Sequence, residues 1–106
     1  MYGMYNFKEV GVDFLDAGNK DGIHLIDVRT DAEVSRGVID GAVHIPLHLL
    51  PLRADEVPED KPVVISGARS AQACAFMAAK GYRNMHNLAG GIQAWARSGR
   101  PITYPS

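Results

Sequence analysis

Between residues 23 and 33 the chain reads Ile23-His24-Leu25-Ile26-Asp27-Val28-Arg29-Thr30-Asp31-Ala32-Glu33. The first six of these residues are almost all apolar and follow a glycine, which is typical of a strand buried on both faces of a sheet. Thr30 and Glu33 have the spacing of a capping box, in which two side chains bind backbone amides at the start of a helix. A buried strand that leads directly into a helix indicates an α/β fold.

The same order of elements recurs outward from this segment. Further strands are predicted at residues 42–45, 62–65 and 84–88, and further helices at residues 7–17, 70–80 and 90–97, with a short helix and a loop at 47–52 around Pro51. The first helix is expected because Asn6 and Glu9 form a second possible capping box before apolar residues at helical spacing. We therefore predict a parallel central sheet with helices on both faces.

The composition fits one globular domain, and we expect residues 1–106 to form it. Of the 106 residues, 46% are apolar, and 11 Lys and Arg stand against 12 Asp and Glu. Charges of both signs are interspersed, so no basic surface for nucleic acid is predicted. The apolar runs are far shorter than the roughly 20 residues that span a bilayer, so no membrane partner is expected. A single cysteine is compatible with a cytoplasmic protein, which is our expectation.

The carboxyl ends of parallel strands form the ligand crevice of open α/β sheets. The segments that follow the predicted strands, and should converge there, are residues 27–30, 46–48, 66–70 and 89–91. The third reads Ser66-Gly67-Ala68-Arg69-Ser70 and lies at a helix start, where free amides and the helix dipole favour an anion. Gly67 allows a close backbone approach, Arg69 supplies a cation, and Ser70 can cap the helix. An ordinary turn with Arg69 paired to a structural carboxylate is the alternative.

Four motifs stand in order along the chain. They are Leu25-Ile26-Asp27-Val28-Arg29-Thr30-Asp31-Ala32-Glu33, then Gly37-Val38-Ile39-Asp40-Gly41-Ala42-Val43-His44-Ile45-Pro46, then Gly67-Ala68-Arg69-Ser70, and finally Asn87-Leu88-Ala89-Gly90-Gly91-Ile92-Gln93-Ala94-Trp95 with Gly99-Arg100-Pro101-Ile102. Together they resemble the single-domain rhodaneses, a sulfurtransferase family, from about residue 6 to residue 102. One motif alone is weak, but four in the family's order are specific. The second departs slightly, because the family usually has His-Ile-Pro where this chain has Val38-Ile39-Asp40.

The active-site loop departs further from the family. Rhodaneses have a cysteine as the first residue of a loop of the form Cys-x-x-Gly-x-Arg, and counting back from Arg69 puts Val64 there. If Val64 began the loop, the preceding strand would be too short for a central strand. The simpler alignment keeps residues 63–65 in the strand and leaves the chain about three residues short before Gly67. The missing piece would contain the cysteine.

The resemblance implies a two-step sulfur exchange without a metal or an organic cofactor. A loop cysteine takes sulfane sulfur from a donor such as thiosulfate, and its persulfide passes the sulfur to cyanide, to a cellular thiol or to a sulfur-relay protein. A thiolate among inward-pointing amides at a helix start has a lowered pKa, which makes it nucleophilic near neutral pH. Residues 66–70 would hold the persulfide, while Asp27 and Arg29 would brace the loops.

Two explanations of the absent cysteine are open. Either the loop is truncated and the chain is a catalytically silent relative that binds an anion or a partner protein, or a segment between Val64 and Gly67 is missing from the printed sequence. We favour the second, because the rest of the anion-binding loop, Gly67-Ala68-Arg69-Ser70, is present. It predicts a break or distorted geometry between these two residues. A regular trans connection, with consecutive Cα atoms about 3.8 Å apart, would favour the silent relative.

Other candidate groups are assigned to structure. Cys74 lies in the helix after the loop and is expected to pack as an inert apolar residue. His44 and His48 have the spacing of a helical metal pair, but Pro46 between them disfavours a continuous helix, so no metal site is expected. Phosphatase chemistry, for which related folds use a longer Cys-to-Arg loop, is disfavoured by so short a loop.

Overall fold

The computed structural model describes residues 7–16 and 22–105, whose strands form one five-stranded sheet in the order β1-β5-β4-β2-β3. Every neighbouring pair is parallel. The strands are β1 (Lys8–Val10), β2 (His24–Asp27), β3 (Val43–His44), β4 (Val63–Ser66) and β5 (Met85–Leu88). The predicted α/β class with a parallel central sheet is confirmed.

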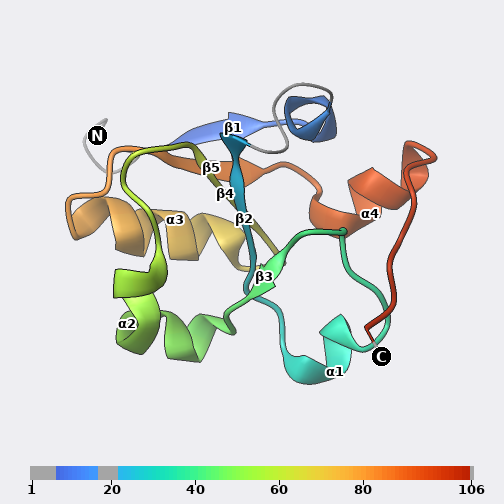
Figure 1. The fold of residues 1–106 in the computed structure, drawn as a ribbon, viewed down its shortest axis with the longest axis horizontal. Helices are drawn as coiled ribbons and strands as arrows, with labels where there is room; N and C mark the ends of the chain where they lie inside the picture. Colours follow the sequence, from blue (N-terminus) through green and yellow to red (C-terminus); the bar gives the residue numbers. More distant parts are fainter. Residues whose placement is uncertain (1–6, 17–21, 106) are drawn as a thin grey trace.

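Helices cover both faces of this sheet. The α-helices are α1 (Asp31–Val34), α2 (Leu50–Arg53), α3 (Ser70–Ala79) and α4 (Gly91–Arg97), and the 3-10 helices are η2 (Val12–Leu15), η4 (Leu47–Leu49) and η5 (Ala54–Glu56). Figure 1 shows α2 and α3 on one side of the strands and α1 and α4 on the other. None of the described helices is long and apolar enough to cross a membrane.

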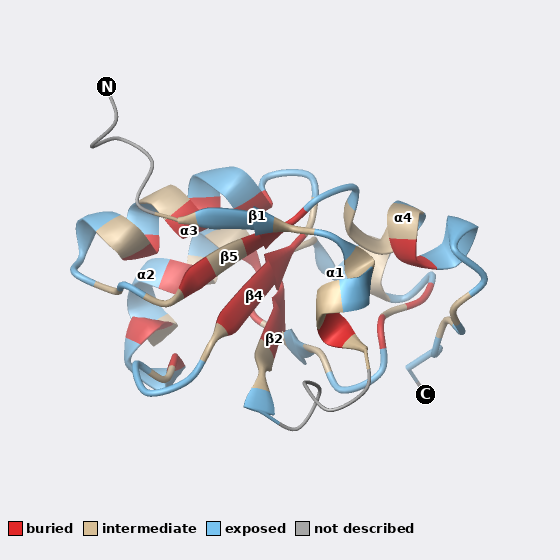
Figure 2. Ribbon diagram, turned by 90° about the horizontal axis from the view of Figure 1, so that it is seen from above, coloured by how far each residue is buried: buried red, intermediate tan, exposed pale blue. Residues whose placement is uncertain are grey.

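The buried side chains of the central strands alternate between two apolar clusters. Ile26 and Ile65 belong to the cluster under α2 and α3, whereas Leu25 and Val64 belong to the cluster that contains Trp95 of α4. All residues of β4 are buried, and Figure 2 shows the buried colour running along the middle of the sheet. Because neighbouring residues of a strand point to opposite faces, an apolar run such as this one fills two cores at once.

The predicted capping box at the start of α1 is confirmed. The Thr30 hydroxyl accepts a hydrogen bond from the Glu33 amide at 3.2 Å, and the Thr30 amide donates to Glu33 Oε1 at 3.0 Å. The predicted strands at 23–28, 42–45, 62–65 and 84–88 and the helices after Ser70 and Gly90 are also present, with slightly different ends. The residues near Pro51 form η4 and α2 rather than one short helix and a loop.

The predicted helix over residues 7–17 is wrong for the described part. Residues Lys8–Val10 form the edge strand β1, and the turn η2 follows at Val12–Leu15. The backbone of β1 pairs with β5 in parallel, with Lys8 opposite His86 and Val10 opposite Leu88. Pairing with a distant strand therefore overrides a local helical pattern. The expected cap at Asn6 and the end of that helix lie outside the described residues.

The expected break between Val64 and Gly67 is also wrong. Strand β4 continues through Ser66, and Val64 and Ile65 pair with β2 on one side and with β5 on the other. The described residues contain no cis peptide bond. Ladders on both sides hold this segment extended, so the turn begins directly at Gly67. Whether the loop is truncated or a segment is absent from the sequence therefore stays a matter of prediction.

Candidate functional site

The segments that follow the strands meet around two adjoining cavities at the carboxyl ends of the strands, as the topology predicts. The first, which we call the apolar cavity, has a volume of about 480 Å³ and is lined by residues 28–30, 46–48 and 68–69 together with Glu33, Leu50, Pro51, Gln72 and Phe76. The second, the polar cavity, has a volume of about 460 Å³, and its lining includes residues 67–68, 70–71 and 87–93 with Glu9, Arg29 and Glu33. Ala68 lines both, so the 66–70 turn lies where the two cavities meet.

The turn itself leaves backbone amides free for a ligand. Gly67 has a φ of 140°, a left-handed value that favours glycine. The Ser70 amide donates to the Gly67 carbonyl at 3.1 Å, so it is not a free donor. No backbone acceptor within the described chain receives the amides of Gly67, Ala68 or Arg69. These three amides lie at the amino end of α3, where the helix dipole favours negative charge.

Arg69 is exposed and lines the apolar cavity, but not the polar one. Its guanidinium has no hydrogen bond or ion pair within residues 7–16 and 22–105. The alternative in which Arg69 pairs with a structural carboxylate is therefore not what the structure shows. Because this cation has no protein counter-ion and lies next to free amides, the electrostatic potential at the turn is positive and attracts a small anion.

Ser66 carries a buried hydroxyl without a partner in the described part of the chain. The residue is 2% exposed, and its Oγ has no hydrogen bond. A Cβ added at Gly91 would lie 3.6 Å from this Oγ and 3.7 Å from the Gly67 nitrogen. The absence of a side chain at Gly91 therefore keeps space beside the Ser66 hydroxyl and the first free amide.

A hydrogen-bonded chain beneath the polar cavity joins the turn to the sheet. The Ser70 hydroxyl donates to Asn87 Oδ1, and Asn87 Nδ2 donates to Glu9 Oε2 at 3.1 Å. Ser70 and Asn87 are both buried. The sequence analysis missed Asn87 and Glu9 as site residues, because only the pairing of β1 with β5 places Glu9 opposite Asn87.

Asp27 and Arg29 lie at the end of β2, and Arg29 lines both cavities. The guanidinium of Arg29 donates to both carboxylate oxygens of Asp27, and also to the carbonyls of Glu33 at 3.3 Å and Gly37 at 2.7 Å. The Arg29 amide donates to Asp27 Oδ1 as well, at 3.0 Å. Arg29 is thereby occupied with protein groups, in contrast to Arg69.

Cys74 lies outside the lining of both cavities. It is 0% exposed, and burial raises the pKa of its thiol from 9.0 to about 12. A neutral thiol packed in the core is not a nucleophile. The described residues therefore offer no sulfur nucleophile at the turn.

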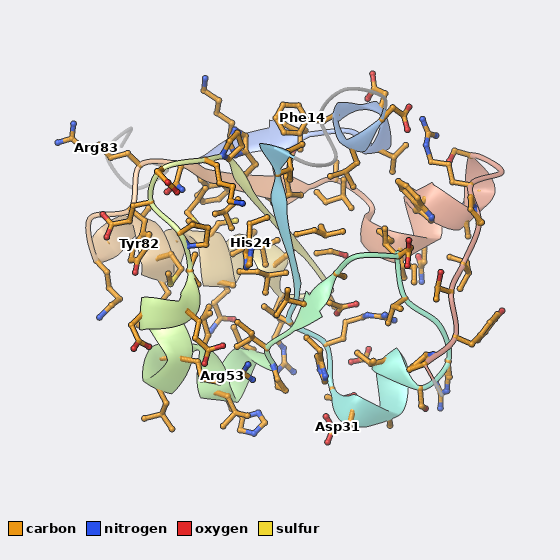
Figure 3. All side chains as sticks on the ribbon, viewed as in Figure 1. Phe14, His24, Asp31, Arg53, Tyr82 and Arg83 are labelled. Atoms are coloured by element: carbon orange, nitrogen blue, oxygen red, sulfur yellow. The ribbon has the colours of Figure 1, made fainter. Side chains whose placement is uncertain are left out.

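Two of the histidines, His44 and His86, have structural contacts. His44 Nε2 is hydrogen-bonded to the carbonyl of Arg29 at 2.7 Å, and its Nδ1 lies 3.8 Å from Asp31 Oδ1. The His86 ring stacks on Phe14, with ring centroids 5.1 Å apart. Figure 3 shows Phe14 at the β1 edge and Asp31 on α1, at opposite ends of the sheet.

Comparison with known proteins places this architecture in a family. The model of the rhodanese-like domain matches residues 12–98. A sulfurtransferase of Allochromatium vinosum is 50% identical over 88 residues, which cover 80% of this chain and 82% of that protein. A thiosulfate sulfurtransferase of Stutzerimonas stutzeri is 27% identical, with 97% of this chain and 93% of that protein covered. A crystal structure of a rhodanese-related protein from Thermoplasma volcanium superposes with a TM-score of 0.83 at 27% identity, and covers 93% of this chain and all of that one.

The relatives support sulfur transfer in general as the activity. With the matched domain, the parallel sheet and the four motifs in agreement, the chain belongs to the rhodanese-like family.

Proposed function

We propose that this protein acts in rhodanese-type sulfur transfer by binding a small sulfur anion, such as thiosulfate, at the 66–70 turn. The observation that carries the proposal is the set of free amides of Gly67, Ala68 and Arg69 at the start of α3, beside an unpaired guanidinium. The buried Ser66 hydroxyl supplies one more donor next to them. The name of the Stutzerimonas relative supports thiosulfate as the donor. We place the reaction in the cytoplasm, where acceptor thiols are kept reduced.

Complete transfer requires a thiolate at this turn. The thiolate attacks the outer sulfur of thiosulfate, the sulfur–sulfur bond breaks, and sulfite leaves with the electron pair, which yields a cysteine persulfide. Cyanide or an acceptor thiolate then attacks the terminal sulfur, takes it away as thiocyanate or as a new persulfide, and regenerates the thiolate. The free amides would stabilise the negative charge of the persulfide throughout.

The chain as it stands performs the binding step without the covalent one. The only cysteine in the sequence is Cys74, and its thiol is buried and neutral near pH 7. The second candidate function is therefore a catalytically silent module of the same family. Both candidates share the anion site and differ only in whether a sulfur atom becomes covalently attached.

Intact-mass spectrometry after incubation with thiosulfate tests this directly. We expect no sulfur adduct on the chain as printed. Inserting Cys-Ala between Ile65 and Ser66 restores the pattern Cys-x-x-Gly-x-Arg, and this variant should gain the mass of one sulfur atom and release thiocyanate when cyanide is added. A sulfur adduct on the unaltered chain would show that the chain is catalytic by itself and would overturn the silent assignment.

The matched control inserts Ser-Ala at the same place. It lengthens the loop identically but carries no thiol, so we expect it to bind thiosulfate without a mass gain. If the Cys-Ala variant folds, with an unchanged circular dichroism spectrum, but takes up no sulfur, the 66–70 turn does not support sulfur transfer and the proposal fails.

A further inference from the structure

The polar cavity holds a charge pattern that a simple anion does not use. Its lining combines the free amides of Gly67 and Ala68 with two carboxylates, those of Glu9 and Glu33. Negative side chains add nothing to a site for thiosulfate alone, because like charges repel each other. The cavity volume of about 460 Å³ falls within the range of roughly 300–1,000 Å³ that is typical of pockets for organic ligands. The cavity therefore has both the space and the charge for a cationic group beside the anion.

The donors of the turn fix the anionic end of such a ligand. Ser66 is 2% exposed, its hydroxyl has no partner in the described part of the chain, and it lies beside Gly91, which lines the polar cavity. Together with the amides of Gly67, Ala68 and Arg69, this hydroxyl brings the free donors to four. A sulfonate-type group has three terminal acceptor atoms, so it satisfies more of these donors than a planar carboxylate with two oxygens.

The two carboxylates of the cavity differ in what they already bind. Glu33 Oε1 accepts hydrogen bonds from the Thr30 amide and hydroxyl, and Arg29 brings a positive charge to the same residue by donating to its carbonyl at 3.3 Å. Glu9 is exposed and accepts one hydrogen bond, from Asn87 Nδ2 at 3.1 Å. Residues 7–16 and 22–105 offer Glu9 no ion-pair partner. Glu9 is therefore the carboxylate that a ligand cation can neutralise.

The order of the strands sets the distance between the two ends of the ligand. Strand β5 lies between β1, which carries Glu9, and β4, which leads into Gly67. Neighbouring strands are about 4.8 Å apart. The hydrogen bond from Asn87 of β5 draws the Glu9 carboxylate toward that strand, so about one strand spacing separates it from the turn. A chain of three carbon atoms between anion and cation bridges such a spacing.

We propose that the polar cavity binds a zwitterion, namely a short aliphatic amine that carries a sulfonate or thiosulfonate group. The sulfur oxyanion lies at the 66–70 turn, and the ammonium group pairs with Glu9. Binding is noncovalent, so it needs no cysteine at the turn. This assignment deepens the proposed function and rests on it, because the same amides and hydroxyl hold the anionic end.

A comparison of 3-aminopropanesulfonate with 1-propanesulfonate tests the role of the ammonium group. Both are titrated at pH 7 and equal ionic strength into the unaltered ¹⁵N-labelled chain, and the amide shifts of Gly67 and Ala68 give the dissociation constants. We expect the zwitterion to bind about two- to fivefold more tightly, which is the range for one exposed ion pair. 4-Aminobutyrate, which has the same chain with a carboxylate, should bind more weakly than 3-aminopropanesulfonate.

Glu9→Gln tests which carboxylate binds the ammonium group. The glutamine keeps an oxygen that can accept the hydrogen bond from Asn87 but has no charge, so the ratio of the two dissociation constants should fall to about one. Glu59→Gln is the matched control, because Glu59 is an exposed carboxylate outside the cavity lining. The control should keep the ratio of the unaltered chain.

The outcomes separate this proposal from the function on which it rests. Equal affinity of the unaltered chain for the zwitterion and for 1-propanesulfonate, or an equal effect of Glu9→Gln and Glu59→Gln, would overturn the zwitterion site. Tighter binding of 4-aminobutyrate than of 3-aminopropanesulfonate would overturn the preference for a sulfur oxyanion. If thiosulfate and 1-propanesulfonate bind and the ammonium group adds nothing, the anion site stands. If none of these anions shifts the amides of the turn, the proposed function fails as well.

Discussion

The guanidinium of Arg29 holds the carboxylate of Asp27 at two points, with Nε 2.9 Å from Oδ1 and Nη2 2.8 Å from Oδ2. Both side chains are largely buried, at 10% and 4% exposure. The same guanidinium also binds the carbonyls of Glu33 and Gly37. This pair therefore ties the end of β2 to α1 and to the segment after it, and Arg29 and Glu33 line both cavities.

Replacing Arg29 by Met should strongly destabilise the protein. The substitution keeps much of the volume but leaves the buried Asp27 carboxylate without its cation, which typically costs about 3–5 kcal/mol of unfolding free energy. Urea denaturation measures the loss. Arg53→Met, which breaks the exposed pair with Glu56, serves as the control and should have a much smaller effect. Equal losses in the two variants would contradict a bracing role for Arg29.

Gly67→Ala should damage the turn more than a comparable glycine substitution elsewhere. A Cβ at Gly67 would lie 3.0 Å from Val28 Cγ2 and 3.3 Å from Arg29 Cγ, in addition to the strain of a φ of 140°. We expect a loss of about 1–3 kcal/mol in unfolding free energy, together with weaker thiosulfate binding. Gly81→Ala has a φ of 106° but nothing within 4 Å, so it isolates the backbone strain. Identical thermal shifts for both variants would mean that the contacts at Gly67 are unimportant.

The Cys74 thiol should be unreactive in the folded protein. Burial raises its pKa from 9.0 to about 12, so iodoacetamide should label it slowly at pH 8 and rapidly after unfolding in urea. The raised pKa also makes the stability of the fold depend on pH. The contribution of the protonated Cys74 thiol to the free energy of unfolding is complete below pH 9 and is lost as the pH rises toward 12. The reason is that the thiol loses its proton at a lower pH in the unfolded chain than in the folded one. Rapid labelling of the folded protein at pH 8 would refute the burial of this thiol.

Thr30→Ala should lower the stability of the α1 segment by about 1 kcal/mol, since it removes one half of the capping box. Hydrogen bonds from the Thr30 amide and hydroxyl lower the pKa of Glu33 below 4.5. The stability from the ionised carboxylate is therefore present above pH 4.5 and is lost as the pH falls through the lowered pKa. Urea denaturation at pH 7 and at pH 3 should show a smaller difference between the variant and the unaltered protein at the lower pH. A difference independent of pH would exclude Glu33 as the partner.

The sequence predicted the fold well where local signals and tertiary packing agree. Thr30 and Glu33 predict the start of α1, because a capping box is a local pattern. The apolar runs of β2 and β4 predict central strands, because such runs are typical of strands buried on both faces. The segment around Val10 and Phe14 has helical spacing but forms an edge strand, because its backbone pairs with β5, whose position the local sequence does not contain.

The site was predictable only in part for the same reason. The 66–70 turn follows from a buried strand before a helix, so its position could be derived from the sequence. The chain from Ser70 through Asn87 to Glu9 joins residues brought together by strand pairing, and the missing partner of Arg69 depends on the packing of every neighbouring element. The regular backbone of β4 up to Ser66 depends on its pairing with β2 and β5, which the spacing of the family motif does not contain.

A thiosulfate titration of the ¹⁵N-labelled protein, followed by amide chemical shifts, shows whether the free amides before α3 bind a sulfur anion. Such binding should produce saturable shifts that are largest at Gly67, Ala68 and Arg69, and that are absent when sodium chloride is added to the same ionic strength. Unchanged amide shifts at these three residues, with thiosulfate in large excess, would contradict it.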